Sequence, residues 1–154
     1  MNWITKLAPK IKSILGGKKS LKVADNSWVK CSQCQTMLYS DDLEKNYYVC
    51  PNCDLHLYIH PRTRMKNLFD EGIYEEIPYP TVQLDPLNFK DTNSYKEKFK
   101  EAQAKTEMQD AFLIGYGKMK GISTTVVAMN FKFMGGSLSS AGAEAMVKAA
   151  EHAI

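Results

Sequence analysis

The 154-residue sequence predicts an α+β fold built in two parts, and three observations support this fold class. All four cysteines fall into two Cys-x-x-Cys pairs, which mark a small N-terminal module. Two apolar runs, 111–117 and 122–131, are joined by a short turn as in a β-hairpin. An alanine-rich segment from about Ser140 onward has the composition of a helix. We therefore expect three segments: a basic arm of residues 1–26, a four-cysteine module of residues 27–60, and the incomplete start of a larger domain, residues 61–154.

The cysteines have the spacing of a zinc site. Two residues between cysteines let one tight turn present two thiolates to the same ion. Two such turns complete a tetrahedral site of four sulfur ligands with no position open for water. Because catalytic zinc needs an open position, we expect one structural zinc ion in a zinc finger of residues 31–53. Its predicted ligands are Cys31, Cys34, Cys50 and Cys53.

Other uses of four cysteines agree less well with the sequence. Two disulfides would fit the number, but the chain has no signal-peptide pattern and few other marks of a secreted scaffold. Redox chemistry of the thioredoxin type needs one Cys-x-x-Cys at the start of a helix, and here there are two pairs in hairpin-like surroundings. His56 and His60 could replace a cysteine as ligand, but with four cysteines present we expect them to be bystanders.

The net charge of +3 conceals an uneven distribution. Residues 1–30 hold seven lysines and one acidic residue, whereas residues 31–154 hold 13 basic and 16 acidic side chains. Apolar residues of the stretch 1–15 fall on one side of a helical wheel, which allows a membrane-surface or targeting helix, or an arm docked on a partner or on the body of the protein. We favour docking, because the stretch is short and Pro9 interrupts it. No apolar run approaches the roughly 20 residues that span a bilayer, so we expect a soluble, cytoplasmic protein.

Within the four-cysteine module, the residues between the two pairs predict a short antiparallel sheet. Met37–Tyr39 and Tyr47–Val49 are strand-like, and the polar residues 40–46 between them predict a turn. Alternating apolar residues over 55–59 predict a further strand. Two cysteine turns with a short sheet are the features of a zinc ribbon, and so small a module should fold only with its metal.

The second part begins with a helix that has Pro61 as its first residue and Gly72 as its stop. An extended connector of residues 73–92 follows, and its prolines exclude a regular helix. Ser94, with a glutamate three residues later, fits a capping box for a helix to about Thr106. The Lys and Glu residues of this helix should form a solvated face.

The predicted hairpin and the final helix form one ββα unit. Its second strand is apolar on both faces from Val126 to Met129, so we expect that strand to be central in a sheet. A glycine turn at Gly135 and Gly136 then precedes the last helix. Because the pattern stops after one unit, we expect the domain to be incomplete.

Several motifs occur in the same order as in a known family. On these motifs the chain resembles the carboxyltransferase β subunits of bacterial acetyl-CoA carboxylases. A four-cysteine ribbon alone is shared by many proteins, whereas Phe-Met-Gly-Gly-Ser at this distance behind it is far more specific. The motifs cover nearly the whole chain. They include Trp28-x-Lys30-Cys31-x-x-Cys34, Val49-Cys50-Pro51-x-Cys53-x-x-His56, Phe69-Asp70-Glu71-Gly72, Gly115-x-Gly117 and Met129-Asn130-Phe131-x-Phe133-Met134-Gly135-Gly136-Ser137.

The resemblance implies a zinc ribbon attached to a crotonase-like domain of ββα units. It implies transfer of a carboxyl group from carboxybiotin, on a carrier protein, to acetyl-CoA, which gives malonyl-CoA for fatty-acid biosynthesis. The implied partners are a carboxyltransferase α subunit, the biotin carboxyl carrier protein and biotin carboxylase. The implied carboxyltransferase is a hetero-oligomer of two α and two β subunits.

In that chemistry the thioester oxygen becomes enolate-like, so backbone N–H groups must point at the developing charge. The resemblance places the family's oxyanion-forming glycines in a later turn, so we expect no catalytic residue in these 154 residues and no turnover from them alone. Gly135 and Gly136 belong to an earlier turn, which either binds substrate or shapes the fold. The sequence departs from the family pattern at Ser139, where glycine is expected, and at Asn26-Ser27.

The alternative function is a nucleic-acid-binding zinc ribbon that uses the lysine-rich arm to hold phosphates. Tyr39, Tyr47 and Tyr48 could offer stacking surfaces. Against this alternative, residues 31–53 contain one lysine and three acidic side chains. A ribbon that serves as an interaction lid over an acyl-CoA domain is compatible with the carboxyltransferase function.

Overall fold

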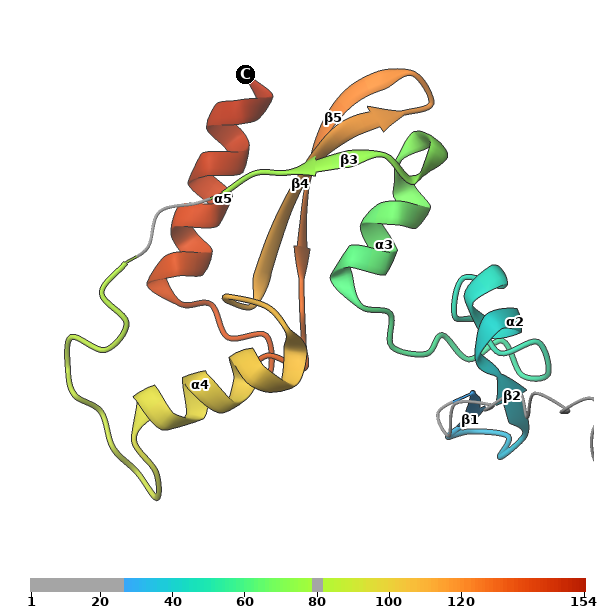
Figure 1. Ribbon diagram of the computed structural model, residues 1–154, viewed down its shortest axis with the longest axis horizontal. Coiled ribbons are helices and arrows are strands. Elements are labelled where there is room, and N and C mark those ends of the chain that lie inside the picture. The colour runs from blue at the N-terminus through green and yellow to red at the C-terminus, as the bar shows by residue number, and fades with distance from the viewer. Residues whose placement is uncertain (1–26, 79–81) are drawn as a thin grey trace, which may run out of the picture. The chain divides into compact units, whose positions relative to one another are not determined.

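A computed structural model gives the structure of the chain and describes residues 27–78 and 82–154 (Figure 1). The amphipathic stretch 1–15 and the rest of the basic arm lie outside the described residues. The chain divides into two compact units, one that ends at His56 and one of Leu57–Ile154, and each is described by itself. In the described ranges, every helix falls short of the length and apolar content that crossing a membrane requires.

The first unit is a two-stranded antiparallel sheet followed by one short helix. Leu38 and Leu43 are buried in it, together with Cys31 and Cys50. Within the described part of the unit, these few side chains make a core too small to stabilise it by apolar burial alone. Its elements are β1 (Trp28–Lys30), β2 (Met37–Tyr39) and α2 (Ser40–Lys45).

The strand predicted at Met37–Tyr39 is confirmed, whereas the partner strand predicted at residues 47–49 is wrong. β2 pairs with β1 instead, so the small sheet encloses the first cysteine pair. Tyr47 and Tyr48 have φ values of 53° and 62°, a left-handed conformation that is incompatible with a strand. These two residues turn the chain toward the second cysteine pair.

Two further predictions for the first unit are wrong. The polar residues 40–46, predicted as a turn, contain α2, which has two aspartates in its first turn and a lysine in its last turn. Such charges favour a helix through its dipole, and Leu43 anchors the helix on the core. The strand predicted at 55–59 is reduced, in the described structure, to one isolated bridge between His56 and Val49.

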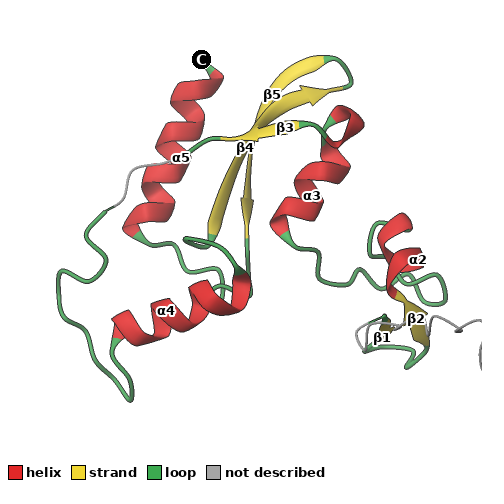
Figure 2. Ribbon diagram, viewed as in Figure 1, coloured by secondary structure: helices red, strands yellow, loops and turns green. Residues whose placement is uncertain are grey.

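The second unit is a three-stranded antiparallel sheet with the order β3-β4-β5. Figure 1 shows α3 and α5 on opposite sides of the sheet and α4 below it. Figure 2 shows that the described residues just before and just after α4 are irregular. The elements are α3 (Pro61–Leu68), β3 (Tyr74–Glu76), α4 (Tyr95–Thr106), β4 (Phe112–Met119), β5 (Ile122–Met129) and α5 (Ser140–Ala153).

The central strand β4 packs against helices on both of its faces. Alternate residues of a strand point to opposite sides, so Phe112 faces α5 while Gly115 and Gly117 face α3. A Cβ atom on Gly117 would lie 2.9 Å from the ring of Phe69, which is buried behind α3. Glycine on this face therefore leaves room for an aromatic ring of the core.

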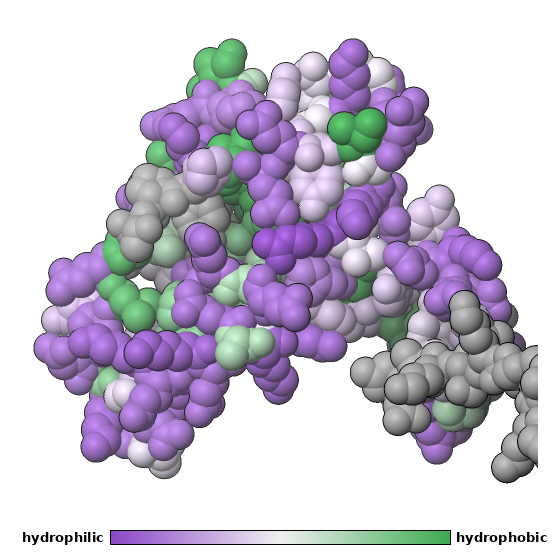
Figure 3. Space-filling model, in the orientation of Figure 1, coloured by the Kyte–Doolittle hydropathy of each residue, from purple (hydrophilic) through white to green (hydrophobic). Residues whose placement is uncertain are grey.

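Local signals in the second unit are confirmed. Pro61 is the first residue of α3. At the start of α4 the Glu97 N–H donates to Ser94 Oγ, and the Ser94 N–H donates to the Glu97 carboxylate. α4 ends at Thr106, as predicted. The solvent-facing side of α4 is hydrophilic, as expected for its Lys and Glu residues (Figure 3).

The predicted hairpin is confirmed as β4 and β5, but the prediction of a central second strand is wrong. In the described part of the chain β5 pairs with β4 alone, and β4 is the central strand. On β5 Ile122 is 70% exposed and Val127 is 36% exposed. The turn between the strands is held by Asp70, whose carboxylate accepts the N–H groups of Lys120 and Gly121, each at 2.8 Å.

Candidate metal centre and glycine turn

Four cysteine sulfur atoms converge in the first unit. The Sγ atoms of Cys31, Cys34, Cys50 and Cys53 all lie within 4.8 Å of one another. The distance from Cys31 to Cys53 is 3.7 Å, and that from Cys34 to Cys50 is 3.6 Å. Four sulfurs around a zinc ion, each about 2.3 Å from it in a tetrahedron, would be about 3.8 Å apart. All four thiols are free, so the arrangement fits a closed zinc site and not a pair of disulfides.

The two cysteine pairs lie in turns of the same construction. The Gln35 N–H donates to the Cys31 carbonyl at 3.1 Å, and the Asp54 N–H donates to the Cys50 carbonyl at 2.9 Å. Gln35 and Asp54 have φ values of 61° and 57°. Each pair is thus followed by a left-handed residue that folds the chain back over the sulfurs, a feature that the cysteine spacing alone does not specify.

The electrostatics of the cluster favour a bound cation. Hydrogen bonding with the side chain and the backbone of Thr36 lowers the pKa of the Cys34 thiol to about 6. At Cys53 a hydrogen bond from the Leu55 N–H lowers the pKa, but burial and the neighbouring cysteines outweigh it and raise the pKa to about 12. The Cys34 thiolate therefore forms readily, whereas ionisation of Cys53 next to it is unfavourable. A dication would remove that resistance, so the donor set suits a metal ion.

Neither histidine near the second cysteine pair takes part in the cluster of described ligand-type side chains. His60 belongs to the second unit and caps α3, where its Nδ1 accepts the Arg62 N–H at 3.2 Å. Its Nε2 lies 3.3 Å from the Thr106 carbonyl oxygen. Because a carbonyl oxygen only accepts, Nε2 is the donor in this contact.

The predicted glycine turn is present in the second unit, between β5 and α5. Gly135 and Gly136 have φ values of 71° and 74°. The Gly136 N–H donates to the carbonyl of Phe133, which is 2% exposed and anchors the turn. The two glycines differ in their surroundings: a Cβ atom on Gly136 would lie 3.2 Å from Met129 Sδ, whereas one on Gly135 would meet no atom of the described residues within 4 Å. Gly136 therefore has a packing role, and Gly135 borders open space.

Ser139, one of the departures from the family pattern, caps the final helix. Its Oγ accepts the Gly142 N–H at 3.1 Å and donates to the Asp110 carboxylate at 3.3 Å. Asp110 also accepts the Ala111 N–H. Burial raises the pKa of Asp110 above its ordinary value although both hydrogen bonds lower it. Serine thus replaces the expected glycine with a side chain that stabilises the start of α5.

Asn130, which is 1% exposed, was not among the residues predicted to form a site. Its Oδ1 accepts the Tyr58 hydroxyl at 2.7 Å and the Lys132 N–H at 2.9 Å. Its Nδ2 contacts Met108 Sδ at 3.1 Å, and its own N–H donates to the Ala111 carbonyl at 2.7 Å. The sequence signal for it is a single amide side chain at the end of an apolar run. A buried Asn needs hydrogen-bond partners, so such a position predicts a polar contact inside the core.

Comparisons with known proteins match both units. The profile of the acetyl-CoA carboxylase zinc finger domain matches residues 28–53, and that of the carboxyl transferase domain matches residues 81–154. The chain is 44% identical over its whole length to the acetyl-coenzyme A carboxylase carboxyl transferase subunit beta of Rhizobium meliloti strain 1021. It is 43% and 42% identical to the subunits of the same name in Sinorhizobium medicae strain WSM419 and Agrobacterium fabrum strain C58. The chain covers 50%, 50% and 51% of these curated relatives, about half their length.

Proposed function

We propose that the chain belongs to the family of acetyl-CoA carboxylase carboxyl transferase β subunits, which it resembles over its whole length, and that it forms part of an enzyme that carboxylates acetyl-CoA. The carboxyl group comes from carboxybiotin on a carrier protein, and the product is malonyl-CoA for fatty-acid biosynthesis. The observation that carries the proposal is the 44% identity over the whole chain. The proposed setting is the cytoplasm.

The proposed role of the first unit is structural. Cys31, Cys34, Cys50 and Cys53 hold one zinc ion, and the closed set of four thiolates leaves no coordination position for water or substrate. Zinc therefore supplies folding energy to a unit whose own core is small. The chemistry of carboxyl transfer belongs elsewhere.

The proposed contact with substrate is the glycine turn. Loss of a proton from the acetyl methyl group makes the thioester oxygen enolate-like, and preorganised N–H groups stabilise such charge. Gly135 supports this role better than Gly136, because the space next to it is open. A cavity of about 280 Å³ lies beside residues 137–141 and is also lined by Tyr95 and Phe99. The principal oxyanion-forming glycines are proposed to lie outside these 154 residues.

The proposed partners are the carboxyltransferase α subunit, the biotin carboxyl carrier protein and biotin carboxylase. Two α and two β subunits would form the carboxyltransferase. The carrier protein brings biotin as a mobile group, so the β subunit needs surfaces for the substrate and for the α subunit and no biotin of its own.

A chimaeric subunit tests the function directly. In it, residues 1–154 replace the matching half of the Rhizobium meliloti subunit, which the chain resembles at 44% identity. Purified with the α subunit and a carboxybiotinylated carrier, the chimaera is expected to form malonyl-CoA, while the 154-residue chain under the same conditions forms none. A folded chimaera that assembles with the α subunit but transfers no carboxyl group would contradict the proposal.

Variants of the chimaera separate the turn from the zinc site. Gly135→Val places a side chain in the open space and also strains the left-handed backbone of the turn, so it should raise the KM for acetyl-CoA or lower kcat, with zinc content unchanged. Lys100→Ala, at an exposed position of α4, is the matched surface control. Unchanged kinetics for Gly135→Val would remove the turn from the substrate site and leave the family function untouched.

The nucleic-acid alternative is not favoured. The exposed residues between the cysteine pairs include Asp41, Asp42 and Glu44 but only one lysine, Lys45. A surface with this charge repels phosphates.

A further inference from the structure

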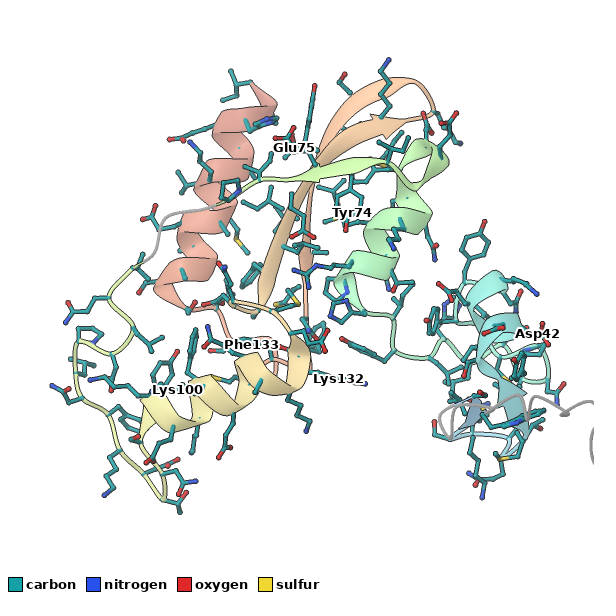
Figure 4. The ribbon with its side chains drawn as sticks, viewed as in Figure 1. Asp42, Tyr74, Glu75, Lys100, Lys132 and Phe133 are labelled. Atoms are coloured by element: carbon teal, nitrogen blue, oxygen red, sulfur yellow. The ribbon has the colours of Figure 1, made fainter. Side chains whose placement is uncertain are left out.

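A cavity of about 350 Å³ in the second unit collects basic side chains from three separate segments. It lies beside the C-terminal end of α4 and is lined by His60, Arg62, Lys105 and Lys132. Glu107 is the acidic residue among its lining residues. Figure 4 places Lys132 next to this end of α4.

The carbonyl groups that would repel an anion here are already occupied. A helix C-terminus carries partial negative charge on its last carbonyls. The Thr106 carbonyl accepts from His60 Nε2 at 3.3 Å, and the Glu107 carbonyl accepts from Arg62 Nη1 at 3.0 Å. The backbone at this end of α4 therefore has its negative charge offset before any ligand arrives.

Lys132 is held in position by the buried Asn130. The Asn130 side chain accepts the Lys132 N–H at 2.9 Å and the Tyr58 hydroxyl at 2.7 Å. The Lys132 ammonium group lies 4.0 Å from the centre of the Tyr58 ring. The ring thus orients the ammonium group without neutralising its charge.

The two lysines of the cavity have no acidic partner among the residues that the structure describes. In the described ranges, no ion pair joins Lys105 or Lys132 to a carboxylate, whereas Arg62 pairs with Glu76 at 2.9 Å. The lining carries three positive side chains and one carboxylate. Two ammonium groups that keep their donors free, next to a guanidinium group, match the charge and the oxygen acceptors of phosphate.

We propose that this cavity binds the phosphate groups of a small ligand that carries at least two phosphates. The size of the cavity suits a diphosphate, and its open side leaves room for whatever the phosphates are attached to. Lys105 and Lys132 make the main contacts, and Arg62 contributes charge from its pair with Glu76. An anion site here does not require the carboxyl transfer proposed above to be correct.

The test measures binding of pyrophosphate to the zinc-loaded 154-residue chain by calorimetry at low ionic strength. The double variant Lys105→Ala/Lys132→Ala is expected to weaken pyrophosphate binding about tenfold, because it removes two charges from the site. The matched control is Lys66→Ala/Lys100→Ala, which removes two exposed lysines of α3 and α4 that do not line the cavity. The lysines of residues 1–26 are intact in both variants, so their contribution cancels.

The outcomes distinguish a specific pyrophosphate site from general attraction of pyrophosphate to a basic chain. A tenfold loss in the cavity variant with less than a twofold loss in the control supports the proposal. No measurable binding by the wild-type chain, or equal losses in the two variants, overturns it.

Coenzyme A identifies the source of the phosphates. If it displaces pyrophosphate and the cavity variant weakens both ligands, the site holds the phosphates of a nucleotide-like substrate. If pyrophosphate binds and coenzyme A does not compete, the site serves a free polyphosphate. Both results support an anion site.

Discussion

At the scale of single residues, Asn130 joins segments that are far apart in the sequence. Tyr58 comes from the segment before α3, Met108 from the loop after α4, and Lys132 from the turn that leads to Gly135. Buried amides of this kind define one arrangement of the chain because every donor and acceptor of the amide needs its partners in place. Asn130 thus connects the geometry of the glycine turn to that of the basic cavity.

Replacement of Asn130 by alanine should destabilise the second unit by about 2 kcal/mol, because it leaves the Tyr58 hydroxyl and the Lys132 N–H without their acceptor. Urea unfolding monitored by circular dichroism measures the change. Asn67→Ala, at an exposed position of α3, is the control and should change stability little. Equal stability of the two variants would contradict the role assigned to Asn130.

Asp110 should make the protein less stable as the pH rises. Burial raises the pKa of Asp110, so between its unfolded and folded pKa values the folded state binds more protons than the unfolded state. Stability then falls from about pH 4 upward until the folded pKa is passed. Asp110→Asn should therefore raise the urea midpoint at pH 7, and the gain should vanish at pH 3.

Asp91 provides a control of opposite sign. The hydrogen bond from Lys98 lowers the pKa of Asp91 to about 2, so its stabilisation is present at neutral pH and is lost as the pH falls from about 4 to 2. Asp91→Asn should lower the urea midpoint at pH 7 and have a much smaller effect at pH 2, where the carboxyl of the folded protein is about half protonated. The same trend in both variants would show that these assignments are wrong.

At the scale of elements, α5 packs closely enough on β4 to require glycine within a helix. A Cβ atom on Gly142 would lie 2.4 Å from Cε2 of Phe112, which is itself 3% exposed. The ring therefore has little freedom to move away. Glycine inside a helix usually costs about 1 kcal/mol relative to alanine, and here close packing reverses that preference.

Gly142→Ala should destabilise the second unit by about 1–2 kcal/mol, since overpacking outweighs the better helix propensity of alanine. Thermal unfolding gives the measurement. The same substitution in a Phe112→Leu background should cost less, because leucine lacks Cε2, the ring atom nearest to the new methyl group. An equal cost in both backgrounds would contradict the steric explanation.

At the scale of the whole molecule, the two units are stabilised in different ways. The first has few buried apolar side chains around its four cysteines, whereas the second has a continuous core that includes Phe99, Phe112, Ile114 and Phe133. Metal binding is therefore expected to stabilise the first unit and to have no effect on the stability of the second.

Zinc removal should unfold the first unit and leave the second folded. Cys50→Ser should reduce bound zinc from one ion per chain to a small fraction, and amide NMR signals of residues 27–56 should lose dispersion while those of 57–154 keep theirs. Ser32→Ala, an exposed position between two cysteines, should retain zinc and all signals. Loss of dispersion throughout the chain would show that the units do not fold separately.

Features that depend on neighbouring residues could be predicted from the sequence. Ser94 and Glu97 form their capping box from neighbouring atoms, and Pro61 begins α3 because it lacks an N–H. The cysteine cluster was predictable for the same reason, since the spacing limits where two sulfurs can lie. The open space beside Gly135 was not predictable, because it depends on how residues distant in the sequence pack.

Predictions failed where other parts of the chain override local preference. Tyr47 and Tyr48 have high strand propensity, yet they adopt left-handed conformations because the chain must turn toward the second cysteine pair. The apolar run from Val126 to Met129 suggested burial on both sides. Position in a sheet depends on which strands pair, and periodicity does not report it.

The exposed edge of β5 has a consequence for handling the isolated chain. In the described residues its outer N–H and C=O groups face no other strand, and Ile122 and Val127 lie exposed along it. A regular edge of eight residues rich in β-branched side chains is a template for edge-to-edge pairing between molecules. The 154-residue chain should therefore aggregate as its concentration rises, and light scattering should show this. A lysine at Val127 should delay the aggregation.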